Sequence, residues 1–199
     1  VESGVWIDQI GNANFALANA SIVDSAVRIS GTTSYGVLNE PEPALNTRYL
    51  IGKMVSMGTT SGLCYAMLGT TASKVFGELL EISVKDDTKY ITVIGYSSNG
   101  YNYNTSVNGQ EYFVVTLTRS ATKVRVYING VFLSEISTLS ERADKWVINH
   151  RDANGVPTTS GYNATMDLMY IGIANTIHTD TEIHENSNWL LKKFGLTNF

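Results

Sequence analysis

Four side chains near the end of the sequence are of types that hold divalent metal ions. They alternate along one short stretch, at His178, Asp180, Glu182 and His184. In an extended chain every second side chain points to the same side, so these four would place two imidazoles and two carboxylates on one face. Such nitrogen and oxygen donors hold divalent cations such as calcium. The pattern therefore raises a metal-site hypothesis, with an ordinary solvated, charge-rich loop as the competing interpretation.

A second group combines aromatic and amide side chains in the middle of the sequence. Its members are Tyr96, Asn99, Tyr101, Asn102 and Tyr103. Tyrosine rings stack on the apolar face of a pyranose, and amides hydrogen-bond its hydroxyls, so the group has the chemistry of a glycan contact. Asn is also an ordinary turn residue, and the competing interpretation is a hairpin connection whose tyrosines lie back on the protein.

A third candidate loop follows an expected strand that contains Trp146. It carries His150, Asp152 and Asn154, which would supply a charged edge to a glycan-binding cleft. Asp and Asn also form turns by bonding to their own backbone, and this is the competing interpretation.

The elements that would position these loops are strands. Short β-branched and aromatic runs recur along the whole chain, separated by clusters of Gly, Asn, Asp and Thr. The expected strands are 26–30, 49–57, 63–68, 79–85, 90–96, 112–119, 123–128, 131–136, 146–149, 168–173 and 190–196. Only 137–144 shows a helical pattern, and many short strands with frequent turns predict an all-β sandwich or barrel.

The clearest turn is Asn129-Gly130, between two β-branched runs. Both residues tolerate the positive φ that a two-residue hairpin turn requires. In the strand before this turn, Val124, Val126 and Ile128 would share one face, so we expect that face to be buried and the opposite face to be at least partly wet.

The length, charge and composition of the chain argue against several classes of protein. The chain has 199 residues, of which 43% are hydrophobic and 16% charged, and we expect one domain spanning 1–199. A net charge of −4 without a basic cluster argues against nucleic acid as a partner. No apolar run reaches the roughly 20 residues that a membrane-spanning helix needs, so we expect no membrane insertion. The single Cys64 excludes an internal disulfide.

Several segments, in order along the chain, resemble the laminin-G-like branch of the concanavalin A-like lectin/glucanase superfamily. They are 5–14 (VWIDQIGNAN) with 27–35 (VRISGTTSY), 127–131 (YINGV), and 169–172 (MYIG) with 193–198 (KFGLTN). The resemblance implies a two-sheet antiparallel jelly-roll sandwich. It does not imply one function, because lectins, glycanases and structural adhesion domains share this fold.

Glycanases of this superfamily carry paired carboxylates on one strand, usually as E-x-D-x-x-E, and this chain lacks that motif. Glu78 and Glu81 would fall on opposite faces of a strand, so we expect no enzyme activity.

We expect a non-catalytic, lectin-like domain of a cell-surface, secreted or phage receptor-binding protein. Its partners would be a glycan or cell-surface polysaccharide and other domains of a larger protein, at the cell surface, on a virion or otherwise outside the cell. The alternative is a structural adhesion or assembly domain without a sugar site, and a glycan hydrolase is the third possibility.

Overall fold

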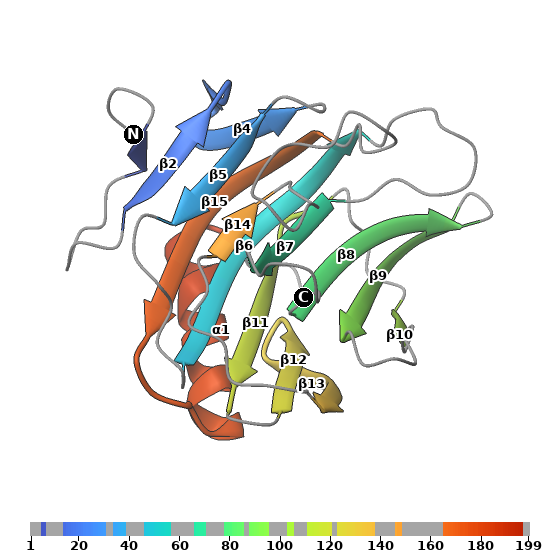
Figure 1. Cartoon of the computed structure of the whole chain (residues 1–199). Helices are drawn as coiled ribbons and strands as arrows, with labels where there is room; N and C mark the ends of the chain where they lie inside the picture. The colour runs from blue at the N-terminus through green and yellow to red at the C-terminus, as the bar shows by residue number, and fades with distance from the viewer. Residues whose placement is uncertain are drawn as a thin grey trace.

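The computed structural model describes residues 5–6, 14–30, 34–38, 46–56, 66–70, 78–85, 88–95, 103–105, 111–120, 123–137, 146–148 and 165–196. These residues form two antiparallel sheets and one helix (Figure 1). In spatial order, the eight-stranded sheet contains β1 (Val5–Trp6), β2 (Phe15–Ala18), β5 (Tyr35–Leu38), β14 (Trp146–Ile148), β7 (Ala66–Thr70), β8 (Glu78–Lys85), β9 (Thr88–Gly95) and β10 (Tyr103–Thr105). The seven-stranded sheet contains β13 (Val131–Ser137), β12 (Lys123–Ile128), β11 (Phe113–Arg119), β6 (Asn46–Ser56), β15 (Thr165–Ala174), β4 (Ala26–Ser30) and β3 (Ser21–Val23).

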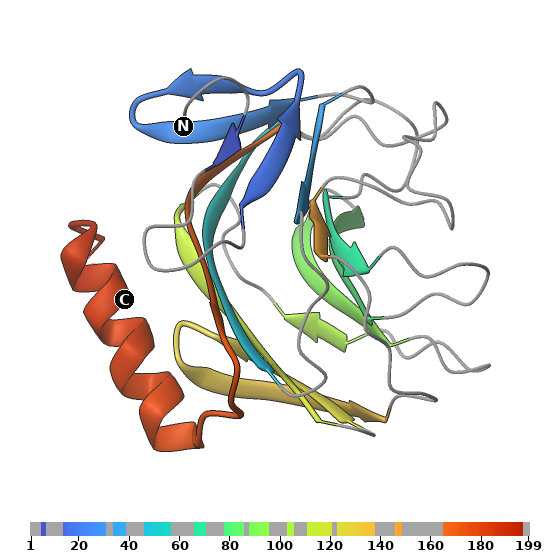
Figure 2. The ribbon, with the colours of Figure 1, turned by 60° about the vertical axis from the view of Figure 1, so that its left-hand side comes forward.

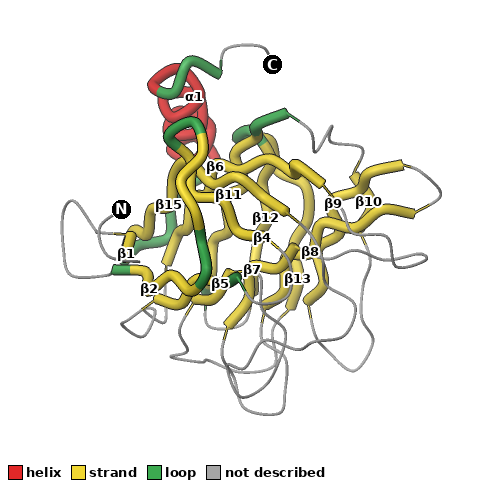
Figure 3. Tube along the Cα trace, turned by 90° about the horizontal axis from the view of Figure 1, so that it is seen from above, coloured by secondary structure: helices red, strands yellow, loops and turns green. Residues whose placement is uncertain are grey.

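The molecule has three layers. The seven-stranded sheet lies in the middle, with the eight-stranded sheet on one side and α1 (Asp180–Lys193) on the other (Figure 2). From above, α1 lies beside β6, β15 and β11, and β7 and β8 lie farther away (Figure 3). The predicted two-sheet antiparallel sandwich is confirmed, and α1 is an addition that the sequence patterns did not predict.

Burial of β11 follows from this layering. All seven residues from Phe113 to Arg119 are buried. Side chains alternate across a strand, so one set faces the eight-stranded sheet and the other faces α1. The expected wet face of β12 is therefore only partly exposed: Tyr127 is 1% exposed, and Arg125 keeps partial contact with solvent.

The Asn129-Gly130 turn has the predicted geometry. Its φ values are 50° at Asn129 and 78° at Gly130, and Ile128 pairs with Val131 across it. The Asn129 side chain also has a structural role, because its Oδ1 accepts from the backbone N–H of Val114 at 2.8 Å. This bond fastens the turn to β11.

The expected strand at 190–196 is wrong, because most of this segment belongs to α1. Thr179 and Glu182 form a capping box at the start of the helix, in which each side chain accepts from the backbone of the other. Ile183, Leu190 and Leu191 then lie on one helical face, at a spacing that suits a helix and not a strand. The helical pattern at 137–144 lies outside the described residues apart from residue 137, which ends β13.

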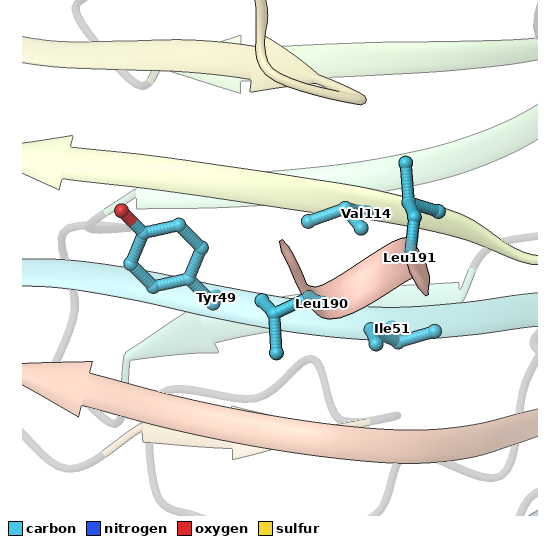
Figure 4. Packing of buried hydrophobic residues seen from close by; sticks show 5 residues of the cluster. All are labelled: Tyr49, Ile51, Val114, Leu190 and Leu191. Atoms are coloured by element: carbon cyan, nitrogen blue, oxygen red, sulfur yellow. The ribbon is translucent and has the colours of Figure 1, made fainter. Parts of the chain in front are cut away.

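Apolar packing holds α1 against the middle sheet. Leu190 and Leu191 pack on Tyr49 and Ile51 of β6 and on Val114 of β11 (Figure 4). Burial of aliphatic and aromatic surface provides the main driving force for this docking. The helix therefore covers part of the outer face of the seven-stranded sheet.

Candidate functional site

The first predicted glycan loop lies mostly outside the described residues. This holds for Tyr96, Asn99, Tyr101 and Asn102, whereas Tyr103 is the first residue of β10. Tyr103 pairs with Val93 of β9, and β10 ends the eight-stranded sheet. The backbone at Tyr103 thus lies at a sheet edge, in the layer farthest from α1 (Figure 2).

The second predicted loop, with His150, Asp152 and Asn154, also lies outside the described residues. The strand before it is described: β14 pairs with β5 on one side and with β7 on the other. The glycan contact at both loops stays a prediction.

The predicted metal ligands lie at the start of α1 and take separate partners. His178 Nδ1 is 2.8 Å from Tyr49 Oη, and Asn186 Nδ2 donates to the same Tyr49 oxygen at 3.1 Å. Burial raises the pKa of the Tyr49 hydroxyl, with a smaller opposing effect from the Asn186 hydrogen bond. Through this contact, His178 connects the segment before α1 to β6.

Asp180 anchors the helix to β12. Its Oδ1 accepts from Arg125 Nη1 at 2.6 Å and from Tyr127 Oη at 2.8 Å. The Tyr127 and Arg125 hydrogen bonds hold the pKa of Asp180 below its usual value. In turn, burial and then the hydrogen bond to Asp180 raise the pKa of Tyr127.

The other two predicted ligands bond within the helical segment. Glu182 Oε2 accepts from the backbone N–H of Thr179 at 2.7 Å, and this bond lowers the pKa of Glu182. His184 Nε2 lies 3.0 Å from Asn188 Nδ2, one turn along α1.

The shared face on which the metal hypothesis depended is therefore absent. Asp180 begins a helix, and residues two apart in a helix point about 200° apart instead of to one side. Across the described residues, no three His, Cys, Asp or Glu side chains are grouped so that they could hold a metal ion. Glu182 caps α1, His178 and Asp180 attach the start of the helix to the sheet, and His184 contacts Asn188 within the helix.

The structure assembles another charged cluster that the sequence patterns did not predict. Asp167 of β15 is 2% exposed and accepts two bonds from Arg28 of β4, from Nε at 2.6 Å and from Nη2 at 2.7 Å. Lys53 Nζ of β6 lies 4.0 Å from Asp167 Oδ2 and 4.5 Å from the centre of the Tyr112 ring. We call these four residues the Arg28–Lys53 cluster.

Electrostatic interactions connect Arg28 and Tyr112 to Asp167. The hydrogen bond to Asp167 raises the pKa of Arg28. Burial raises the pKa of Tyr112, the charge of Asp167 raises it further, and the charge of Arg28 opposes this rise. The available sequence signal was a single charge inside each of two apolar strands, Val27-Arg28-Ile29 and Met166-Asp167-Leu168. Only the β4–β15 pairing places these opposite charges together.

A hydroxyl pair lies on the same sheet face as the cluster. Ser30 Oγ and Thr165 Oγ1 are 2.8 Å apart. Ser30 pairs with Thr165, and Arg28 pairs with Asp167 two residues along the same ladder. Because side chains two apart on a strand share a face, hydroxyls and charges form one polar surface.

No protein-family model and no curated protein matches the sequence. Solved structures do match. The binding domain of Paraclostridial Mosquitocidal Protein 1 is 15% identical with a TM-score of 0.66, over 96% of this chain and 51% of that one. The chain shares its fold with the matched half of that binding domain.

Two further neighbours come from botulinum neurotoxins. The serotype D ligand binding domain, solved in complex with N-acetylneuraminic acid, is 13% identical with a TM-score of 0.64, over 90% of this chain and 47% of that one. Another structure comes from a study of botulinum neurotoxin type C, in which cell entry depends on interaction with two ganglioside molecules. It is 14% identical with a TM-score of 0.58, over 90% of this chain and 47% of that one. This chain thus spans about half of the length of its neighbours. The laminin-G-like branch stays a prediction.

Within the described residues, no helix is long and apolar enough to cross a membrane.

Proposed function

We propose that this chain is a non-catalytic glycan-binding domain of a secreted, cell-binding protein. The observation that carries the proposal is its sandwich fold, shared with about half of a toxin ligand binding domain that was solved in complex with N-acetylneuraminic acid. At 13% identity the fold alone is shared, so the sugar-binding residues must come from this chain's own chemistry. Its many neutral polar and tyrosine side chains suit sugar hydroxyls and pyranose faces.

The spacing of Glu78 and Glu81 gives no support for hydrolysis. Both residues lie on β8, where they pair with Gly95 and Thr92 of β9. A glycosidase needs two carboxyl groups on either side of one sugar bond. Positions on one strand share a face when they are two residues apart, and these two are three apart.

For the contact itself we keep the tyrosine-rich loop as the first candidate and the loop with His150, Asp152 and Asn154 as the second. Tyr101 and Tyr103 would stack on the sugar ring, with Asn99 and Asn102 bonding to its hydroxyls. The experiment is a glycan array with neutral and sialylated glycans, followed by affinity measurements on Tyr101→Ala and Tyr103→Ala. We expect each variant to weaken binding about threefold to tenfold.

Trp189→Ala is the control for these variants. It also removes an aromatic side chain, which is 55% exposed and lies on α1, in the opposite layer of the molecule. We expect this variant to bind normally. Unchanged affinity in both tyrosine variants would move the contact away from this loop. An array without any bound glycan would contradict the proposed function and favour the structural assembly domain.

A further inference from the structure

We propose that the Arg28–Lys53 cluster binds the carboxylate of an acidic sugar of the sialic acid type. This inference rests on the proposed glycan-binding function and assigns it a site on the outer face of the seven-stranded sheet. Arg28, Asp167 and Lys53 lie on β4, β15 and β6, and Tyr112 directly precedes β11.

Donors for a carboxylate are present in the cluster. Arg28 donates hydrogen bonds from Nε and Nη2 to Asp167. Its Nη1 has no hydrogen-bond partner among the described contacts, so its two N–H groups can donate to another acceptor. The Arg28 side chain is 29% exposed. Lys53 is 32% exposed, and its Nζ stands 4.0 Å from Asp167, beyond direct hydrogen-bond distance. Both cations therefore reach solvent with unused donors.

Exposed charged donors, and not an excess of positive charge, would attract an anion to the cluster. Arg28 and Lys53 carry two positive charges, and buried Asp167 supplies one negative charge between them. Asp24 acts electrostatically on Arg28 and on Tyr112, so the four charges balance. A carboxylate that bridges Nη1 and Nζ would form charge-assisted hydrogen bonds, which are stronger than bonds between neutral groups.

The surroundings match a sugar better than a simple anion. The Ser30–Thr165 hydroxyl pair lies next to the cluster on the same face and is exposed to solvent. Hydroxyls both donate and accept, as sugar hydroxyls require. Tyr112 adds a half-buried ring under Lys53, which holds the ammonium group in place. Positive donors beside neutral hydroxyls are the arrangement that an acidic sugar needs.

The test compares 3′-sialyllactose with lactose, which lacks the carboxylate but keeps the neutral disaccharide. Calorimetric titration of the 199-residue chain should give binding of sialyllactose that is clearly tighter than binding of lactose. Lys53→Met should weaken the sialyllactose affinity about tenfold, the effect expected from loss of one charged hydrogen bond. Lys53→Arg, which keeps a positive donor, should restore most of the affinity.

Lys123→Met is the matched control. Lys123 lies on the same sheet, is 52% exposed and forms an ion pair with Glu135. Its replacement changes the net charge by as much as Lys53→Met does, but at a position far from the cluster in the strand order. We expect it to leave sialyllactose binding within about twofold, because salt screens distant surface charges. Melting temperatures of both variants serve as the check on folding.

Equal weakening by Lys53→Met and Lys123→Met would overturn the inference, since it would indicate long-range attraction without a site. Equal affinity for lactose and sialyllactose would also overturn it and leave the glycan-binding function intact. Failure of every glycan on the array would contradict the function itself.

Discussion

Two features of the structure require a glycine at position 130. Its φ of 78° lies in the left-handed region, which other residues rarely adopt. A Cβ built on it would also lie 3.0 Å from His184 Cα and 3.2 Å from Ser187 Cβ, so the hairpin turn packs tightly against α1. The sequence predicted the first requirement from the Asn-Gly pair. It could not predict the second, because the helix was not expected.

We therefore predict that Gly130→Ala destabilises the protein more than the backbone conformation alone requires. Gly195→Ala is the control, because Gly195 has a φ of 71° and a Cβ added to it would meet no atom within 4 Å. The control should cost about 1 kcal/mol of unfolding free energy, and Gly130→Ala should cost at least about 1 kcal/mol more. Urea unfolding of both variants measures the difference. Equal losses would show that the turn does not press on α1.

At the scale of elements, α1 shows how apolar runs and helix caps can point to different structures. The apolar run at its end suggests a strand, yet the Thr179–Glu182 capping box and the spacing of Ile183, Leu190 and Leu191 fit a helix. The residues of the metal-site hypothesis lie at this helix start, where acidic side chains interact favourably with the helix dipole. The capping box by itself predicts the helix, and in a helix these alternating residues do not share one face.

Because Asp180 anchors this helix, its contribution to stability should depend on pH. Its pKa is lower in the folded protein than in the unfolded chain, mainly through the Tyr127 and Arg125 hydrogen bonds. Such a carboxyl stabilises the fold fully above its unfolded pKa, about 4, and loses this contribution as pH falls through the lower folded pKa. We predict that Asp180→Asn is less stable than the wild type at pH 7 and that the difference shrinks below about pH 4.

Urea midpoints measured between pH 7 and pH 2.5 would test this prediction. Glu185→Gln is the control, since Glu185 is an exposed carboxyl of the same helix without a hydrogen bond among the described contacts. A pH-independent gap between Asp180→Asn and the wild type would contradict the assigned role of the carboxylate.

At the scale of the whole molecule, the strand runs predicted the sandwich because most of its longer strands alternate or are continuously apolar. The strands at 26–30 and 123–128 were predicted with their observed bounds. Short strands such as β1 and β3 were missed, because two or three residues carry no periodicity and form only by pairing with a neighbour. The Arg28–Lys53 cluster was missed for a related reason: Arg28 and Asp167 are 139 residues apart, and only the sheet order joins them.

The three-layer arrangement implies that the sandwich depends on its helix. Deleting residues 178–199 would expose Tyr49, Ile51 and Val114, on which Leu190 and Leu191 pack. Each buried aliphatic side chain contributes about 1.5–3 kcal/mol, so loss of α1 should remove a large part of a total stability of about 5–15 kcal/mol. We predict that the truncated protein melts at a lower temperature and binds a hydrophobic dye strongly.

A synthetic peptide of residues 178–199 provides the matching control for this deletion. Added to the truncated protein, it should restore the melting temperature and displace the dye, because it replaces the buried helical face. The same peptide with Leu190→Asp and Leu191→Asp should do neither, since charged side chains cannot pack on the apolar sheet face. If the truncated protein kept its melting temperature and bound no dye, the outer face of the sheet would not need α1, and the helix would be an appendage instead of the third layer of the fold.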